Sequence, residues 1–156
     1  MWKDCVDSNI YGAVLVVYCR KTKRYLLLRE LRDKPKVFKK KNMFGFASET
    51  KEEEDQSVLG TIGRLVHEEL GVKLNIDDVI LKVTPIRNFR HKIPVYVSWT
   101  VVGDEFEAVP NDTDVTYGGW YTESQIRDAP TFPNGLRIET IEVLDTVIQL
   151  GRDALI

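Results

Sequence analysis

Residues 64–72 read RLVHEELGV and end the most regular apolar pattern in the chain. Apolar residues recur in this region every three or four positions, at Leu59, Ile62, Val66 and Leu70. The spacing predicts an amphipathic helix over residues 57–70 that buries one stripe of side chains. Gly71 follows the pattern directly and is a typical helix stop.

The predicted helix also carries one guanidinium and two carboxylates. Arg64 and Glu68 lie one turn apart on one face, and Glu69 lies about 100° further round. Hard cations such as Mg²⁺ prefer clustered carboxylate oxygens and share their remaining positions with water and substrate phosphates. The pair is compatible with a site for Mg²⁺ and a diphosphate, although most helical glutamate pairs are only solvated surface charge.

The rest of the chain is rich in short apolar runs that favour strands. Such runs occur at residues 12–19, 25–31, 79–86, 93–102 and 118–121. The first two form a hairpin through a polar turn, and the alternation of Val95, Val97, Trp99 and Val101 predicts one face of a sheet.

Two further helices complete the order of elements. Thr122 begins a short helix, because Gln125 three residues later completes a capping-box pattern. A last helix is predicted over residues 134–150, closed by Gly151, with Ile141, Leu144 and Ile148 facing inward. No repeat or linker interrupts this order, so one domain over residues 1–156 is expected. A mixed sheet with helices on its faces, an α/β fold, packs these elements.

Composition excludes several classes of protein. The chain has 156 residues with a formal net charge of -2, so we expect no nucleic-acid partner. Cys5 and Cys19 lack metal-ligand spacing and are too few for a disulfide scaffold, which favours a cytoplasmic location. The longest apolar run, residues 12–18, is far shorter than a membrane span, and the first residues lack a signal-peptide layout.

A basic segment, RDKPKVFKKKN, covers residues 32–42. It is either a solvated loop or a loop that meets a polyanionic ligand. Arg29 and Arg32 near the second strand, and His91 between two later strands, are candidates for contacting phosphate in the same way. For His91 a plain turn position is the alternative.

The sequence resembles the Nudix hydrolases. Their box is written Gly, five residues, Glu, seven residues, Arg-Glu-apolar-any-Glu-Glu-any-Gly-apolar, and its second half is similar to residues 64–72. The order of elements over residues 10–150 is also similar. The resemblance implies the Nudix fold, a mixed curved β-sheet sandwiched between α-helices, with Mg²⁺, or also Mn²⁺, as cofactor. It also allows a homodimer.

The first half of the box departs from the family pattern. Gly45 and Glu49 resemble its beginning, but eleven residues rather than seven separate Glu52 from Arg64. An acidic insertion of about four residues accounts for this difference. The resemblance then implies Glu49 and Glu52 as metal ligands beside Glu68 and Glu69, with Arg64 orienting the carboxylates.

A second departure concerns the catalytic base. Leu65 stands where the family has a glutamate that often binds metal or serves as base, and leucine can do neither. Some members place the base in a later loop, and Asp112 and Asp114 lie in the matching region. Glu105 and Glu107 are further candidates.

Three functions follow from the resemblance. The leading hypothesis is a Mg²⁺-dependent hydrolase that cleaves a nucleoside diphosphate linked to another moiety by attack of water on phosphorus. The first alternative is a non-catalytic Nudix-fold module that binds a small nucleotide or a partner. The second is a sugar-nucleotide C–O hydrolase of the GDP-mannose type, which shares Arg-Leu in the box but uses a loop histidine that this chain lacks there.

Overall fold

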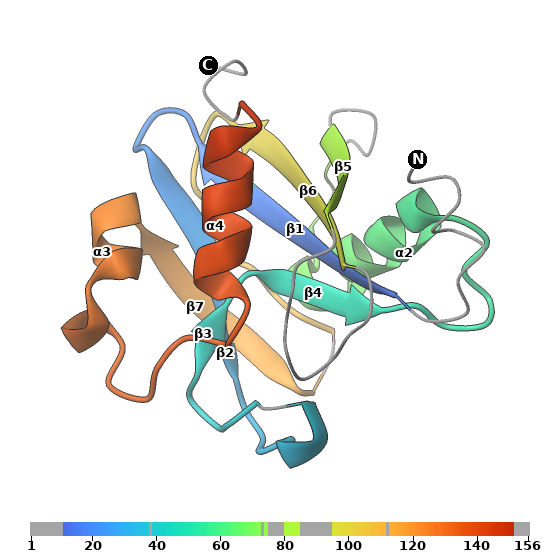
Figure 1. Cartoon of the computed structure of the whole chain (residues 1–156), viewed down its shortest axis with the longest axis horizontal. Coiled ribbons are helices and arrows are strands. Elements are labelled where there is room, and N and C mark those ends of the chain that lie inside the picture. Colours follow the sequence, from blue (N-terminus) through green and yellow to red (C-terminus); the bar gives the residue numbers. More distant parts are fainter. Residues whose placement is uncertain are drawn as a thin grey trace.

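The fold is a mixed β-sheet covered by helices on both faces (Figure 1). The computed structural model describes residues 11–37, 39–72, 74, 80–84, 95–111 and 113–151. The strands are β1 (Gly12–Cys19), β2 (Arg24–Glu30), β3 (Phe44–Gly45), β4 (Ala47–Thr50), β5 (Ile80–Thr84), β6 (Val95–Val102) and β7 (Val115–Tyr121). The α-helices are α2 (Val58–Leu65), α3 (Glu123–Arg127) and α4 (Thr140–Gln149). Shorter helical turns are η1 (Pro35–Val37), the π-helical η2 (Val66–Leu70) and η4 (Ala129–Thr131).

Strand β1 lies at the centre of the sheet. The strand order is β3-β2-β1-β6-β5, β4 also pairs with β1, and β7 also pairs with β2. Only the β1–β6 pairing is parallel among these described pairs, so the sheet is mixed. The prediction of a mixed sheet between helices is confirmed.

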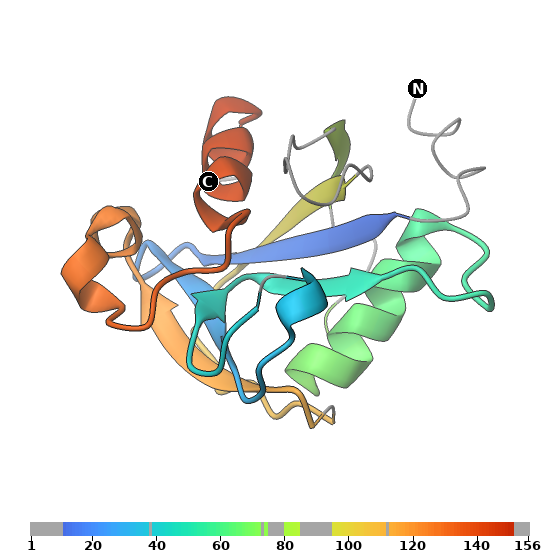
Figure 2. The same cartoon turned by 60° about the horizontal axis from the view of Figure 1, so that its bottom comes forward.

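The two faces of β1 pack against different helices (Figure 2). Ala13, Leu15 and Val17 belong to a core with side chains of α2, whereas Val14 and Val16 belong to a core with side chains of α4. Successive residues of a strand point to opposite faces, so both cores need apolar residues from one run. This requirement explains why residues 12–19 are apolar throughout rather than alternating.

The predicted helix over residues 57–70 is confirmed, with two differences. Ser57 caps it, because the Ser57 hydroxyl accepts a hydrogen bond from the backbone of Gly60 at 3.0 Å. Leu59, predicted to face inward, is 40% exposed. The last turn is π-helical and ends with a bond of 3.0 Å from the Gly71 N–H to the Val66 carbonyl.

The last helix begins later than the sequence predicts. It starts at Thr140 instead of residue 134, because the preceding segment pairs with β3. The Phe44 N–H donates to the Gly135 carbonyl at 3.1 Å, and the Arg137 N–H donates to the Phe44 carbonyl at 2.7 Å. The prediction that Ile141 faces inward is wrong, since this side chain is 36% exposed.

Most of the remaining predictions agree with the structure. The capping box of Thr122 and Gln125 is present, and the hairpin of β1 and β2 lies as expected. Strand β7 begins three residues earlier than predicted, at Val115. No helix among the described residues combines the length and apolarity that a membrane span requires.

Candidate active site

Arg64 is the centre of an acidic cluster. Its guanidinium forms ion pairs with Asp55 at 2.8 Å, Glu52 at 2.9 Å, Glu49 at 3.0 Å and Glu68 at 3.3 Å. Strand β4, the loop after it and the box helix, which is formed by α2 and η2, therefore converge on the side chain of Arg64. Four carboxylates face one guanidinium, so ionised acids leave an excess of negative charge that a cation can balance.

Three of these acids are close enough to share a cation. Carboxylate oxygens of Glu49, Glu52 and Glu68 all lie within 4.8 Å of one another. Clustered carboxylate oxygens of this kind fit Mg²⁺ or Mn²⁺ rather than softer metals. The structure thus brings together three of the four residues predicted as metal ligands, and metal binding by them stays a prediction.

The protonation of the cluster depends on burial and on Arg64. Burial raises the pKa of Glu49 to about 7, against the lowering effect of the Arg64 charge. Hydrogen bonding to Arg64 lowers the pKa of Asp55 to about 2. A bound cation favours the ionised form of a carboxylate, so metal binding here is expected to release the proton of Glu49.

Glu69, the fourth predicted ligand, points elsewhere. It is only 5% exposed, and its Oε1 accepts a hydrogen bond from the Ser48 N–H at 3.0 Å. Burial raises the pKa of Glu69 to about 7, and the charge of Arg137 opposes this rise. Glu69 thus binds the backbone of β4 at Ser48, the residue that precedes Glu49.

A buried ion-pair network behind β4 was not predicted from the sequence. Arg137, 3% exposed, donates to the Ser48 hydroxyl at 2.8 Å and to the Glu30 carboxylate at 3.3 Å. Its guanidinium lies so close to Gly45 that a Cβ there would be 2.1 Å from Arg137 Nε. The sequence feature that could have indicated this network is Glu30, because a glutamate at the end of an apolar strand is unusual unless a partner compensates its charge.

The loop before β7 is attached to the end of the box helix. The Asn111 N–H donates to the Glu68 carbonyl, and the Val109 N–H donates to the Leu70 carbonyl, both at 2.8 Å. Gly71 has a φ of 64°, and a Cβ on it would lie 1.8 Å from the Val109 carbonyl oxygen. Only glycine therefore fits between helix and loop.

Of the predicted catalytic and phosphate-binding residues outside the box, some form polar contacts with neighbouring side chains and others lie outside the described residues. Asp114 lies beside Lys34 and 3.6 Å from Arg32, and the hydrogen bond from Lys34 lowers the pKa of Asp114. Arg29 donates to Asn42 at 2.6 Å. Asp112 and His91 lie outside the described residues. The roles proposed for these residues stay predictions.

Leu65 lies in the core rather than at the cluster. Its side chain is fully buried with that of Ile62 between α2 and the sheet. The position at which the family has a carboxylate therefore serves packing in this chain.

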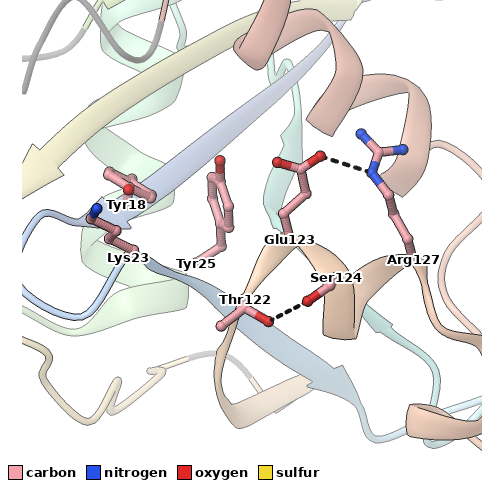
Figure 3. Close-up of a pocket in the computed structure, with 7 residues that line it drawn as sticks. All are labelled: Tyr18, Lys23, Tyr25, Thr122, Glu123, Ser124 and Arg127. Atoms are coloured by element: carbon pink, nitrogen blue, oxygen red, sulfur yellow. Dashed lines mark hydrogen bonds and ion pairs between the residues drawn. The ribbon is translucent and has the colours of Figure 1, made fainter.

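Among the residues that the structure describes, two cavities open near the sheet. The larger, of about 780 Å³, is lined by Asp33, Pro35, Lys39, Lys40, Met43, Leu136 and Ile138. Figure 3 shows the other, of about 480 Å³, lined by Tyr18, Lys23 and Tyr25 of the hairpin and by Thr122, Glu123, Ser124 and Arg127. Arg127 pairs with Glu123 at 3.1 Å there. The hairpin turn and α3 lie on the side of the molecule opposite α2 (Figure 1).

Solved structures identify the fold. A Nudix hydrolase from Nitrosomonas europaea superposes with a TM-score of 0.63 over 89% of this chain and 88% of its own, at 14% identity. The chain has the Nudix fold. The Nudix domain of Shewanella oneidensis NrtR complexed with ADP ribose gives a TM-score of 0.58 over 94% of this chain and 87% of its own, at 15% identity.

A longer protein with this fold is also similar. The bifunctional NMN adenylyltransferase/ADP ribose pyrophosphatase from Francisella tularensis, complexed with AMP and a manganese ion, gives a TM-score of 0.62 at 15% identity. The match covers 90% of this chain but 41% of the Francisella protein, so the chain spans less than half of that protein's length. No family model matches the sequence, and no curated protein matches it.

Proposed function

We propose that this Nudix-fold chain is a Mg²⁺-dependent hydrolase of a nucleoside diphosphate linked to another moiety. The observation that carries the proposal is the convergence of Glu49, Glu52 and Glu68 within 4.8 Å of one another on Arg64. The known proteins with this fold are consistent with it, since they include an ADP ribose pyrophosphatase complexed with AMP and manganese.

Each residue of the cluster has a distinct role in this proposal. Glu49, Glu52 and Glu68 hold the cation through carboxylate oxygens, and Arg64 fixes their orientation by charge-assisted hydrogen bonds. Mg²⁺, when bound, neutralises phosphate charge and polarises the phosphorus centre. Glu69 positions Glu49 through its bond to the backbone of Ser48.

The base that deprotonates water is proposed to come from the loop before β7. Leu65 is buried and has no proton acceptor, so the position at which the family often has its base does not provide one here. The bond from Asn111 to the Glu68 carbonyl attaches this loop to the box helix. Asp112 is the next residue and therefore the first candidate, with Asp114 the second.

A panel of substrates tests the proposal. We would incubate the protein with Mg²⁺ and ADP-ribose, dinucleoside polyphosphates, nucleoside triphosphates, nucleotide sugars and NADH, and identify products by mass spectrometry. Glu68→Gln should abolish most turnover, whereas Glu142→Gln, an exposed change on α4, should leave it unchanged. Turnover that survives Glu68→Gln would refute the assignment.

A binding module is the second candidate, and the buried Leu65 favours it. A Nudix domain complexed with ADP ribose is also among the similar structures. Tight binding of a nucleotide without cleavage of any panel member, in either Mg²⁺ or Mn²⁺, would support this candidate over the hydrolase.

A further inference from the structure

Strand β4 is held in the sheet from one edge. It is four residues long, and among the described strand pairs it pairs with β1 alone. Its register with β1 places Ser48 opposite Val14 and Glu49 opposite Ala13. Val14 belongs to the core on the α4 side, and Ala13 belongs to the core on the α2 side. Because paired residues share a face, the Ser48 side chain points to the α4 side and the Glu49 side chain points to the acidic cluster.

Two side chains from outside the sheet bind Ser48. The Glu69 carboxylate accepts a hydrogen bond from the Ser48 N–H at 3.0 Å, and the Arg137 guanidinium donates one to the Ser48 hydroxyl at 2.8 Å. Both of these charged residues are buried, Glu69 at 5% and Arg137 at 3% exposure. The residue directly before Glu49 is therefore fixed at its backbone by the box helix and at its side chain by the segment that leads into α4.

This segment, residues 135–139, places Arg137 behind β4 (Figure 2). The Arg137 N–H donates to the Phe44 carbonyl at 2.7 Å, and the Phe44 N–H donates to the Gly135 carbonyl at 3.1 Å. Gly45 leaves the space that the guanidinium occupies, since a Cβ there would lie 2.1 Å from Arg137 Nε. Glu30, at 3.3 Å, compensates the charge. Backbone and side chain of Arg137 are thus both anchored to the strands that lead to Glu49.

The buried ion pair is poorly optimised for stability. Arg137 Nε and Nη2 and Glu30 Oε1 are buried without a hydrogen-bond partner among the described residues, although Glu139 lies 3.4 Å from Nε. Such atoms cost free energy, and replacing a whole buried ion pair by apolar side chains is often neutral or stabilising. Stability alone therefore explains this buried arginine poorly, whereas its bond to Ser48 reaches the strand that carries Glu49.

We infer that Arg137 is a positioning residue for the metal site, which acts through Ser48 to orient the Glu49 carboxylate. The inference rests on the proposed function, because it requires a cation at the acidic cluster. Electrostatics alone predicts the opposite sign: a positive charge repels a cation, so removal of the Arg137 guanidinium should strengthen cation binding. A loss of cation affinity on its removal is therefore a signature of positioning.

Binding of Mn²⁺ tests the inference without requiring turnover. We would titrate Mn²⁺ into the metal-free protein and measure the unbound ion by electron paramagnetic resonance. Ser48→Ala removes the hydroxyl, changes no charge and leaves the pair of Arg137 and Glu30 in place. Arg137→Met removes one charge, and Arg137→Met with Glu30→Gln removes both. Arg127→Met is the matched control, because it removes a guanidinium from α3, on the side of the molecule opposite α2 (Figure 1). Urea unfolding measures the stability of each variant.

Positioning and stability predict different patterns. Ser48→Ala and Arg137→Met should each weaken Mn²⁺ binding about tenfold, the lower end of what residues that orient metal ligands typically contribute. The double variant should regain part of the stability that Arg137→Met loses, but it should bind Mn²⁺ as weakly as Arg137→Met. Arg127→Met should leave the Mn²⁺ affinity unchanged.

Two results would overturn the inference and leave the metal site in place. One is a Mn²⁺ affinity of Ser48→Ala equal to that of the natural chain. The other is a Mn²⁺ affinity of the double variant that recovers together with its stability, since a merely structural role of Arg137 predicts this recovery. A natural chain that binds no Mn²⁺ would instead remove the metal site of the proposed function, and the inference with it.

Discussion

The pair of Arg137 and Glu30 offers a sharp test of the structure. Arg137 is 3% exposed and Glu30 is 1% exposed, and their charged groups lie 3.3 Å apart. Arg137→Met therefore leaves a buried carboxylate without its main partner, which typically costs about 3–5 kcal/mol. Lys39 lies near enough to compensate in part, so we expect the lower end, about 3 kcal/mol.

Chemical and thermal unfolding measure this cost. A loss of about 3 kcal/mol from a total of about 5–15 kcal/mol is large, and for a chain of this size it lowers Tm by about 6–12 °C. Arg127→Met is the matched control, because Arg127 pairs with Glu123 and Asp145 at the surface. Its cost should stay below about 1 kcal/mol.

A double-mutant cycle separates the ion pair from simple packing. Arg137→Met with Glu30→Gln removes both charges, so it should be more stable than Arg137→Met alone by about 1–2 kcal/mol. The reasoning fails if Arg137→Met costs no more than Arg127→Met, or if the effects of the two substitutions simply add.

Three further predictions concern the helix of the box and its cluster. Gly71→Ala should lower the free energy of unfolding in urea by at least about 1–2 kcal/mol, because Gly71 has a left-handed φ and a Cβ there would clash with Val109. Gly63→Ala should raise it by up to about 1 kcal/mol, because a Cβ on Gly63 meets open space and alanine favours the helix. Similar values for both would contradict the structure.

The pKa of Asp55 is lowered from its ordinary value of 3.8 to about 2 in the folded protein, mainly by hydrogen bonding to Arg64. The ionised Asp55 therefore contributes about 2 kcal/mol to the free energy of unfolding. This contribution is fully present above about pH 4 and is lost as the pH falls toward 2. The stability advantage over Asp55→Asn should shrink across that interval, and a constant difference would refute the assignment. Mg²⁺ at about 100 times its Kd should add about 2.7 kcal/mol, seen as a higher Tm that EDTA reverses and Glu68→Gln abolishes. No shift in Tm with either Mg²⁺ or Mn²⁺ would argue against a metal site.

Local patterns in the sequence determined most of the elements. The apolar spacing before Gly71 and the pair of Thr122 and Gln125 each act within a few residues, so they predicted helix positions without knowledge of the fold. The wholly apolar run of residues 12–19 likewise predicted a buried strand.

Tertiary structure decided what the sequence left open. The late start of α4 results from pairing between Phe44 and the segment before the helix, a contact that no local pattern encodes. The π-helical last turn likewise accompanies the docking of the Asn111 loop on the Glu68 carbonyl.

In the candidate site, helix periodicity likewise determined some contacts and tertiary structure determined others. Arg64 and Glu68 are one helical turn apart, so periodicity alone brought them together. Arg137 meets Glu30 across 107 positions and Ser48 across 89. Such distant residues become neighbours only when the sheet assembles, because strand pairing, rather than any spacing along the chain, sets which buried charges face each other.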